Sequence, residues 1–206
     1  MKDRTETNTS PAERTGLLVE IARLDDAAYR AIAQTPTPAL DTALRRLSHA
    51  ADRSKLWIGT AAVMAVVGGA RGRRAAVTGI AAIGVTSAVV NLGFKPLTHR
   101  TRPDRSDAEH EGRHVLMPRS TSFPSGHSAS AFAFAESVGR ELPLLGIPLR
   151  LAAATVAYSR IHTGVHYPGD VIVGSLIGMT AGQLIAAASE RAVPNLSADP
   201  ANASQP

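Results

Sequence analysis

Two long stretches without a charged residue constrain most strongly what this 206-residue chain can fold into. Residues 75–94 and 171–188 contain no Asp, Glu, Lys or Arg. Each approaches the roughly 20 apolar residues that an α-helix needs to cross a bilayer. Helices on the surface of a small soluble domain normally carry a polar face. The alternative is a soluble bundle whose buried helices happen to be uncharged, and we expect membrane-embedded helices instead.

Shorter apolar segments extend this pattern to a whole bundle. Residues 56–70, 125–138 and 144–158 are also predominantly apolar, and Trp57 stands near one end of the first, as an interfacial anchor would. The sequence therefore predicts an all-α fold, a compact membrane helical bundle of about five to six embedded helices. Residues 71–74, Arg-Gly-Arg-Arg, are expected to form a tight basic turn between two of them.

The N-terminal part has a different character. Residues 17–33 and 39–51 combine apolar residues at helical spacing with several arginines, a pattern typical of amphipathic helices at a membrane interface. We therefore expect a disordered segment over 1–14, an amphipathic helical region over 15–54, the membrane bundle over 55–190 and a disordered tail over 191–206. No secretory signal is visible, so internal apolar segments are expected to direct the chain to the membrane.

Composition excludes several classes of function. The chain has no Cys, which rules out disulfides, a thiolate nucleophile and Cys-ligated zinc. A formal charge of +5 favours an anionic partner, either nucleic acid, acidic lipid or a phosphorylated substrate. Aromatic residues make up only 4%, which counts against nucleic acid bound by base stacking. The seven His residues show no HxH or HExxH spacing, so we predict neither a metal site nor a cofactor.

Three short motifs stand at the ends of the expected helices. They are the segment 95–103 (Lys-Pro-Leu-Thr-His-Arg-Thr-Arg-Pro), the segment 124–127 (Pro-Ser-Gly-His) and the segment 159–170, which begins with Ser-Arg and ends with Asp. In an up-and-down bundle these helix ends can lie on the same side. The motifs are then expected to converge at one mouth of the bundle.

The motifs contain the groups that grip a phosphoryl group. Arg102 and Arg160 can each offer a planar fork to two oxygens, and Lys95 adds a point charge. Ser125 and Gly126 open a helix, where free backbone N–H groups and the helix dipole favour an anion. The alternatives for a single arginine are a solvated surface charge or a contact to lipid head groups.

The same motifs contain candidate catalytic groups. His166 and Asp170 are one helical turn apart, so the carboxylate can accept from one ring nitrogen and leave the other nucleophilic. We predict His166 as the nucleophile that forms a phosphohistidine, Asp170 as its orienting group and His127 as the acid that protonates the leaving oxygen and later activates water. The remaining candidates are expected not to react, although His162 could line the site; they are His99, His110, His114 and His162.

Together the motifs resemble the signature of the type 2 phosphatidic acid phosphatase superfamily, Lys-x6-Arg-Pro, Pro-Ser-Gly-His and Ser-Arg-x5-His-x3-Asp. Every fixed position is matched, by Lys95, Arg102, Pro103, Pro124, Ser125, Gly126, His127, Ser159, Arg160, His166 and Asp170. The resemblance implies a helical bundle, metal-independent phosphate hydrolysis and the catalytic roles given above. It also implies that Lys95, Arg102, Ser125, Gly126 and Arg160 hold the phosphate. Membrane members commonly have six spanning helices, whereas the charged, proline-broken region before residue 55 departs from that pattern.

The expected branch of the superfamily is a membrane lipid phosphatase. Its substrate would be a polyprenyl phosphate or diphosphate, or a phosphatidate-type lipid. The superfamily also includes soluble acid phosphatases and vanadium haloperoxidases, which are the alternatives. A non-catalytic protein that binds anionic lipid is a further alternative. The basic residues at 71–74 and the arrangement of many bacterial relatives favour a multi-pass protein of the cell membrane with an outward-facing site.

Overall fold

A computed structural model describes residues 11–105 and 111–192, and this part of the chain is helical and contains no strand. The all-α prediction is therefore confirmed. Three single-turn 3₁₀ segments (η1 Asp52–Ser54, η3 Lys95–Leu97, η4 Glu111–Arg113) and one π-helical turn (η2 Val89–Phe94) accompany the α-helices. The α-helices are α1 Pro11–Gln34, α2 Pro38–Ala50, α3 Lys55–Val67, α4 Gly69–Ala88, α5 Gly126–Glu141, α6 Pro143–His162 and α7 Pro168–Ala192.

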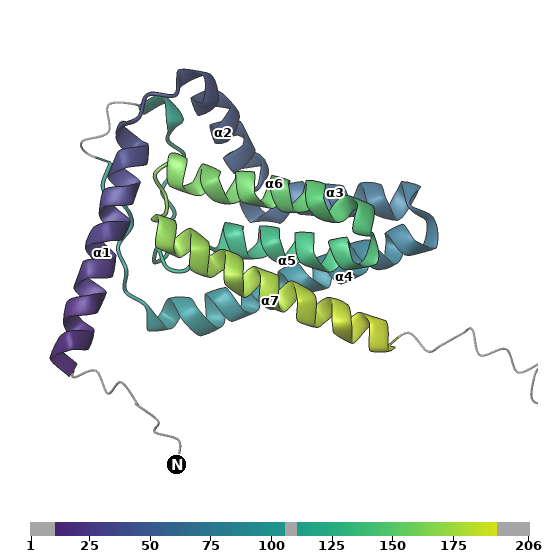
Figure 1. Cartoon of the computed structure of the whole chain (residues 1–206). Helices are drawn as coiled ribbons and strands as arrows, with labels where there is room; N and C mark the ends of the chain where they lie inside the picture. Colours follow the sequence, from purple (N-terminus) through teal and green to yellow (C-terminus); the bar gives the residue numbers. More distant parts are fainter. Residues whose placement is uncertain (1–10, 106–110, 193–206) are drawn as a thin grey trace, which may run out of the picture.

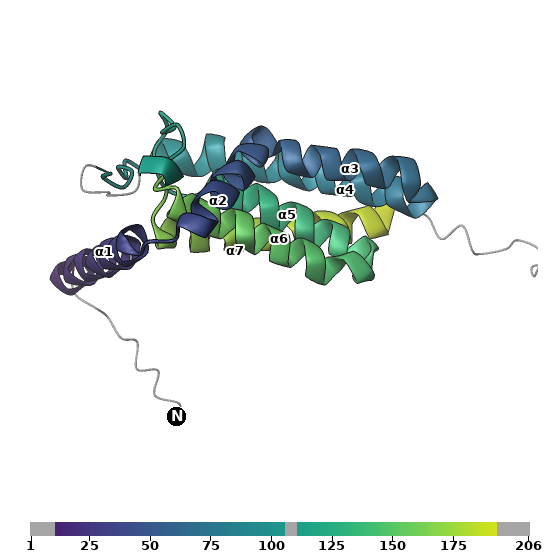
Figure 2. The same cartoon turned by 90° about the horizontal axis from the view of Figure 1, so that it is seen from above.

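The helices form an elongated bundle with α5 in its interior. Helices α3 to α7 run along the long direction of the molecule, and α1 crosses one end of them (Figures 1 and 2). Helix α5 packs against α4, α6 and α7, and most of its residues are buried. On the α3 side, the rings of Trp57 and Phe134 lie 5.4 Å apart at the centre of the main apolar cluster.

A stripe of glycines brings α7 against the backbone of α5. Gly174, Gly178 and Gly182 recur every four residues, so they share one face of the helix. A Cβ atom added at any of them would lie between 2.1 and 2.5 Å from a backbone oxygen of α5 or its N-cap. Only glycine permits so close an approach. At the end of the stripe, the Ser125 amide donates to the Asp170 carbonyl at 2.9 Å, which joins the start of α5 to the start of α7.

The basic segment 71–74 is not a turn, contrary to expectation. The chain reverses at Gly68 and Gly69, where Gly69 has a φ of +59°, and the arginines lie in the first turns of α4. Gly72 contacts α3 so closely that a Cβ there would lie 2.3 Å from the Met64 oxygen. The adjacent glycines, rather than the charges, therefore decide where the chain turns.

The ends of the chain differ slightly from the prediction. Helix α1 begins at Pro11, so residues 11–14, expected with the disordered N-terminus, are helical. Helix α7 continues to Ala192. Residues 1–10 and 193–206 lie outside the described part, as does the loop 106–110.

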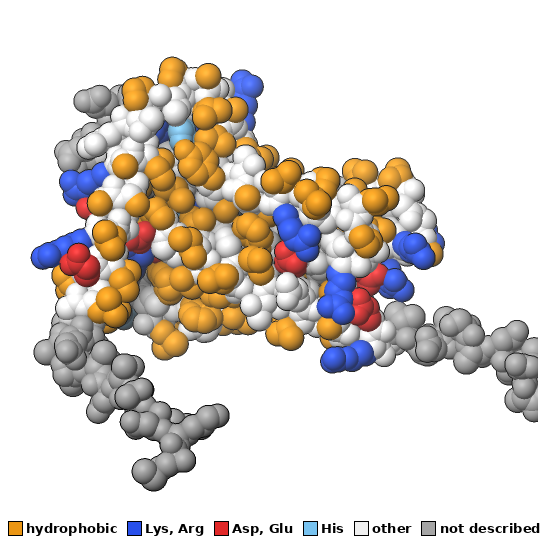
Figure 3. Space-filling view, in the orientation of Figure 1, with side chains coloured by type: hydrophobic (Ala, Val, Ile, Leu, Met, Phe, Trp, Pro, Cys, Tyr) orange, Lys and Arg blue, Asp and Glu red, His pale blue; other side chains and the backbone are white. Residues whose placement is uncertain are grey.

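Three helical stretches in the described residues are long and apolar enough to cross a membrane: Gly69–Leu97, Pro143–His162 and Pro168–Ala192. Helices α3 and α5 are shorter. Large apolar side chains are exposed along the bundle, among them Val66, Leu151 and Leu184. Figure 3 shows such side chains over much of the face formed by α6 and α7, with charges mainly over α1 and at the opposite end. Exposed apolar surface of this extent is typical of a lipid-facing bundle.

An ion pair joins α5 to α6. Glu136 on α5 is buried and accepts two hydrogen bonds from the Arg150 guanidinium on α6, at 2.6 and 2.9 Å. Because an unpaired charge at membrane depth is costly, this bidentate pair explains how α5 and α6 tolerate both residues.

A substitution that adds one methyl group to α7 tests the contact between α5 and α7. We expect Gly178→Ala to lower the free energy of unfolding by about 1–3 kcal/mol, because its Cβ would overlap the Ala129 carbonyl and force the helices apart. Thermal unfolding of the detergent-solubilised protein measures this. Gly84→Ala on α4 is the matched control, since a Cβ there has no atom within 4 Å. Equal melting temperatures for the two variants would contradict the close packing.

Candidate active site

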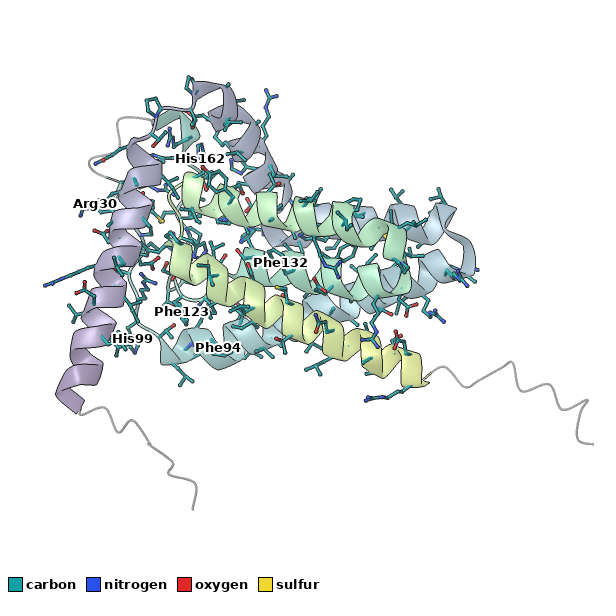
Figure 4. The ribbon with its side chains drawn as sticks, in the orientation of Figure 1. Arg30, Phe94, His99, Phe123, Phe132 and His162 are labelled. Carbon is teal, nitrogen blue, oxygen red and sulfur yellow. The ribbon has the colours of Figure 1, made fainter. Side chains whose placement is uncertain are left out.

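The three sequence motifs meet at one end of the bundle, as expected. The end of α4 with η3, the start of α5, the end of α6 and the start of α7 lie together beside α1 (Figure 1). Figure 4 shows Phe94, His99 and Phe123 near this end. The up-and-down order of the helices therefore brings together groups that are far apart in the sequence.

His166 lies at the centre of this cluster, in the short loop between α6 and α7. Its side chain is almost completely buried, and its Nδ1 atom lies 3.4 Å from the Asp170 carboxylate. Its Nε2 atom lies 3.3 Å from Nη1 of Arg102. Because a guanidinium can only donate, this contact fits a neutral imidazole with the proton on Nδ1 and a free electron pair on Nε2. Burial lowers the pKa of His166 to about 4, although Asp170 acts in the opposite direction.

Several donors fix the buried Asp170 carboxylate. Oδ2 accepts from the Tyr167 amide at 2.9 Å and, at short range, from the Ser122 hydroxyl. Oδ1 accepts from the Arg100 guanidinium at 3.0 Å. A buried carboxylate with this many donors stays ionised and keeps one orientation. Asp170 can therefore hold the His166 ring in place.

Arg102 is directed at the same imidazole by backbone oxygens. Its guanidinium donates to the carbonyls of Ser120, Thr121 and Val165 at 3.0, 3.2 and 2.6 Å. Burial lowers the pKa of Arg102, but an arginine with several acceptors remains charged at neutral pH. The loop and η3 thus present a fixed cation beside Nε2 of His166.

Arg160 is brought to His166 by a reversal of the chain after α6. The amides of Val165 and His166 both donate to the Arg160 carbonyl, at 3.1 and 3.2 Å. Gly164 makes this reversal with a φ of +69°, and a Cβ there would also press on Tyr29. The guanidinium is buried, and its Nε atom has no hydrogen-bond partner in the described part of the chain.

Lys95 approaches the site from the end of α4. Its ammonium group donates to the Ser120 hydroxyl at 3.2 Å, and Arg102 donates to the same hydroxyl at 3.2 Å. The π-helical turn η2 immediately precedes Lys95 and changes the direction in which the following side chains point. The Ser120 hydroxyl therefore joins Lys95 to the Arg102 guanidinium that contacts the imidazole.

Ser125 and Gly126 form the start of α5. The Ser125 hydroxyl accepts from the Ser128 amide at 3.4 Å, so Ser125 is the N-cap of the helix. The amides of Gly126 and His127 occupy the first helical positions, which precede the first intrahelical hydrogen bond. This helix start is suited to an anion.

His127 has a partner that sequence reasoning missed. Its Nε2 atom lies 3.0 Å from the carboxylate of Asp52 in η1. Asp52 is also 3.7 Å from Arg160 and 3.4 Å from His49. The hydrogen bond with His127 is the main cause that lowers the pKa of Asp52. No spacing in the sequence connects Asp52 to the motifs, because the fold brings it from the amphipathic N-terminal region.

Asp25 and Arg100 were also missed. Arg100 donates to Asp170 and, at 2.5 Å, to Asp25 on α1, and its guanidinium lies 4.3 Å above the Tyr167 ring. Asp25 in turn accepts from the Gly169 amide at 2.7 Å. The position of Arg100 inside the first motif was a usable signal, whereas nothing in the sequence indicates Asp25.

The histidines without a predicted catalytic role differ in their surroundings. His162 stands at the end of α6, and its Nε2 atom lies 2.9 Å from Asp41, which ties α6 to α2 (Figure 4). His99 is exposed and His114 is partly buried. His110 falls outside the described residues. Among residues 11–105 and 111–192, no group of three His, Asp or Glu side chains is arranged to hold a metal ion.

Comparison with known proteins agrees with this geometry. The profile of the PAP2 superfamily matches residues 75–194, more than half of the chain. The chain belongs to the PAP2 superfamily. It is therefore an enzyme of a phosphatase family, and the resemblance drawn from the motifs is confirmed.

Two curated relatives match half of the chain or more. Decaprenylphosphoryl-5-phosphoribose phosphatase of Mycobacterium tuberculosis is 36% identical over 149 residues, 72% of this chain and 80% of the relative. Undecaprenyl-diphosphatase BcrC of Bacillus subtilis is 32% identical over 105 residues, 50% of this chain and 49% of the relative.

Solved structures of PAP2 proteins share the fold. A crystal structure of the transmembrane phosphatidylglycerolphosphate phosphatase from Bacillus subtilis has a TM-score of 0.67 at 22% identity, over 85% of this chain and 89% of the other. The crystal structure of Aquifex aeolicus LpxE has a TM-score of 0.61 at 27% identity, over 77% and 92%.

The ionisation of His166 provides a test of the site geometry. We expect its imidazole to remain neutral, with the proton on Nδ1, from pH 8 down to about pH 4, because burial disfavours the charged form. Nitrogen NMR of ¹⁵N-histidine-labelled protein measures both the charge and the tautomer, and the spectrum of His166→Gln identifies the signals. Titration near the ordinary value of about 6.5 would contradict the buried arrangement.

Proposed function

We propose that this PAP2 enzyme is an integral membrane phosphatase that hydrolyses a lipid phosphate or diphosphate through a phosphohistidine intermediate, without a metal ion. The observation that carries the proposal is the position of His166. One of its ring nitrogens faces the buried Asp170 carboxylate at 3.4 Å and the other faces the Arg102 guanidinium at 3.3 Å. A nucleophile held between an orienting carboxylate and an oxyanion-binding cation is the arrangement that phosphoryl transfer requires.

The phosphoryl group would be held by fixed cations and the start of α5. Lys95, Arg102 and Arg160 supply three positive charges, and the unpartnered Nε of Arg160 is a donor that a phosphoryl oxygen would satisfy. Ser125, Gly126 and the first amides of α5 complete the cradle. Because the charge on the transferring phosphoryl group is spread over three oxygens, such positioned donors provide most of the catalysis.

The reaction would proceed in two steps. In the first, Nε2 of His166 forms a bond to phosphorus, the bond from phosphorus to the leaving oxygen breaks, and protonated His127 gives its proton to that oxygen. In the second, water attacks the phosphohistidine, the P–N bond breaks and His127 takes the proton from the water. Inorganic phosphate and the free alcohol, or a lipid monophosphate from a diphosphate, are the products.

Asp52 and Arg100 would act as positioning residues. Burial lowers the pKa of His127, and Asp52, 3.0 Å from its ring, acts against this by favouring the protonated form that the first step needs. Arg100 links Asp170 to Asp25 and so ties the carboxylate that orients His166 to α1. Neither residue would touch the phosphoryl group in this scheme.

The membrane and the named relatives support a lipid substrate. The relatives include phosphatases of a decaprenyl-linked phosphoribose and of undecaprenyl diphosphate. The bundle exposes apolar side chains along its length (Figure 3), and its site lies at the end crossed by α1 (Figure 1). A polyprenyl or phosphatidate-type lipid could then keep its chains in the bilayer while its phosphate reaches His166.

Phosphate release from lipids tests the proposed function. We expect the wild-type protein, in detergent with EDTA, to release phosphate from at least one of a polyprenyl diphosphate, a polyprenyl monophosphate and phosphatidate. His166→Ala removes the nucleophile and should abolish release. His127→Ala should slow it by about 10²–10⁴-fold while vanadate still binds.

The outcomes separate the parts of the proposal. Near wild-type turnover by either variant would contradict the assigned roles. Release that stops with EDTA and returns with magnesium would contradict the metal-independent mechanism.

We also propose that the protein is multi-pass and that its site faces outward. The arginines at the start of α4 lie at the end of the bundle opposite the site, and such clusters favour the cytoplasmic side. The same arrangement supports several spanning helices. Helices α4, α6 and α7 are long enough to cross the membrane, and α5 packs between them.

The absence of Cys makes this orientation directly measurable. We expect Leu116→Cys, in the exposed loop at the site end, to react with a membrane-impermeant maleimide in intact cells. Ala70→Cys, exposed in the first turn of α4, should react only after permeabilisation. The reverse pattern would contradict the outward-facing site.

A further inference from the structure

A cavity of about 240 Å³ opens directly beside His127, between η1 with the start of α3, the end of α4 with η2, and α5. His127, Lys95 and Gly126 are among its lining residues, so it shares its wall with the proposed phosphoryl site. Its other polar lining residues are Arg53, Ser54, Ser87, Asn91 and Ser130. Since His127 is the residue that would protonate the leaving group, this cavity is where the leaving group would lie.

The polarity of this cavity sets it apart from two other hollows among the described residues. A hollow of about 340 Å³ between α5, α6 and α7 is lined almost entirely by apolar side chains, such as Phe132 and Ile161. Another of about 510 Å³, between α4 and α7, includes Val89 and Leu184. Those two hollows suit hydrocarbon chains, whereas the cavity beside His127 does not.

The segment η1, which forms one wall of the cavity, has a strained backbone. Arg53 and Ser54 have φ values of 53° and 59°, and they are the non-glycine residues with positive φ in the described part of the chain. L-residues rarely adopt this conformation, and where it persists it is often functional. Here it places Asp52 at His127 while Arg53 and Ser54 line the cavity.

The opposite wall comes from the π-helical turn and α5. Asn91 lies within η2 and donates to the Ser87 carbonyl at 2.9 Å, and the hydroxyls of Ser87 and Ser130 lie 3.4 Å apart. π-helical turns inside α-helices are frequent at functional sites. Amide and hydroxyl groups at the end of a membrane helix are expected to face polar partners rather than lipid chains.

The positive charge of Arg53 places a second requirement on the leaving group. Arg53 is exposed, lines the cavity and forms no ion pair with a residue of the described chain. A leaving group that also carries an anion would be paired by it. A plain prenyl alcohol offers neither hydroxyl partners nor an anion, and a prenyl phosphate offers only the anion.

We infer that this cavity is a leaving-group subsite for a hydroxylated headgroup. The substrate class is then a phosphomonoester carried on a sugar or polyol, which a phosphodiester joins to the lipid. Asn91, Ser87 and Ser130 contact the hydroxyls and Arg53 pairs with the phosphodiester. This inference rests on the proposed function, since it assumes that His127 protonates the leaving oxygen.

The test compares kcat/KM for two kinds of substrate in the same mixed micelles. Phosphatidylglycerol phosphate and farnesylphosphoryl-5-phosphoribose carry the hydroxylated headgroup, whereas phosphatidate and farnesyl diphosphate lack it. We expect the wild-type enzyme to prefer the first pair by at least tenfold. Asn91→Leu and Arg53→Ala should each reduce that preference by about tenfold.

A ratio between substrates separates recognition from folding, because a poorly folded variant loses all activities together. Thr155→Leu, which places the same side chain on an exposed position of α6, is the control and should keep the wild-type ratio. A wild-type enzyme without preference, or variants that lower all four rates equally, would overturn the inference and leave the proposed function standing. A wild-type protein that releases phosphate from none of the four substrates would instead overturn the proposed function.

Discussion

The close contact between α5 and α7 is the constraint on which the rest of the structure depends. Gly178 and its neighbours in the stripe allow backbone to meet backbone along the two helices. At one end, this contact joins Ser125 to Asp170 through a backbone hydrogen bond of 2.9 Å. The helix start proposed to bind phosphate and the carboxylate proposed to orient the nucleophile are therefore held in one rigid unit.

A second constraint is that every buried charge near this unit needs a partner. Asp170 is completely buried and is satisfied by a hydroxyl, an amide and a guanidinium. Arg102 is satisfied largely by backbone carbonyls, which leave its charge uncompensated and available to an anion. His166 between them remains neutral because burial disfavours its cation. Burial therefore keeps His166 neutral, as a nucleophile must be, and leaves the Arg102 charge able to bind an oxyanion.

Much of this arrangement could be predicted from the sequence, for physical reasons. Uncharged runs of membrane length indicate helices, and an up-and-down topology brings alternate helix ends together, so the meeting of Lys95, His127 and His166 was foreseeable. The spacing of His166 and Asp170 likewise follows from one helical turn. These features depend on local periodicity and chain direction, which a sequence displays.

The features that were missed depend on contacts between distant segments. Asp52 and Asp25 belong to the N-terminal helical region and reach the site only because of how that region folds back. The charges predicted a turn at residues 71–74, whereas the chain reverses at Gly68 and Gly69, because glycine adopts the positive φ that this turn requires. The positions of these residues depend on tertiary contacts or on backbone conformation, and no local residue pattern in the sequence indicates them.

The most direct test of the account is to trap the covalent intermediate on His166. The protein would be mixed with a ³²P-labelled lipid phosphate, quenched in alkali within the first turnover and digested, and the labelled peptide identified. The account predicts label on the peptide that contains His166, stable in alkali and lost in acid, and no label in His166→Ala. Turnover without labelled protein, or label on another residue, would contradict the assignment of His166 as the nucleophile.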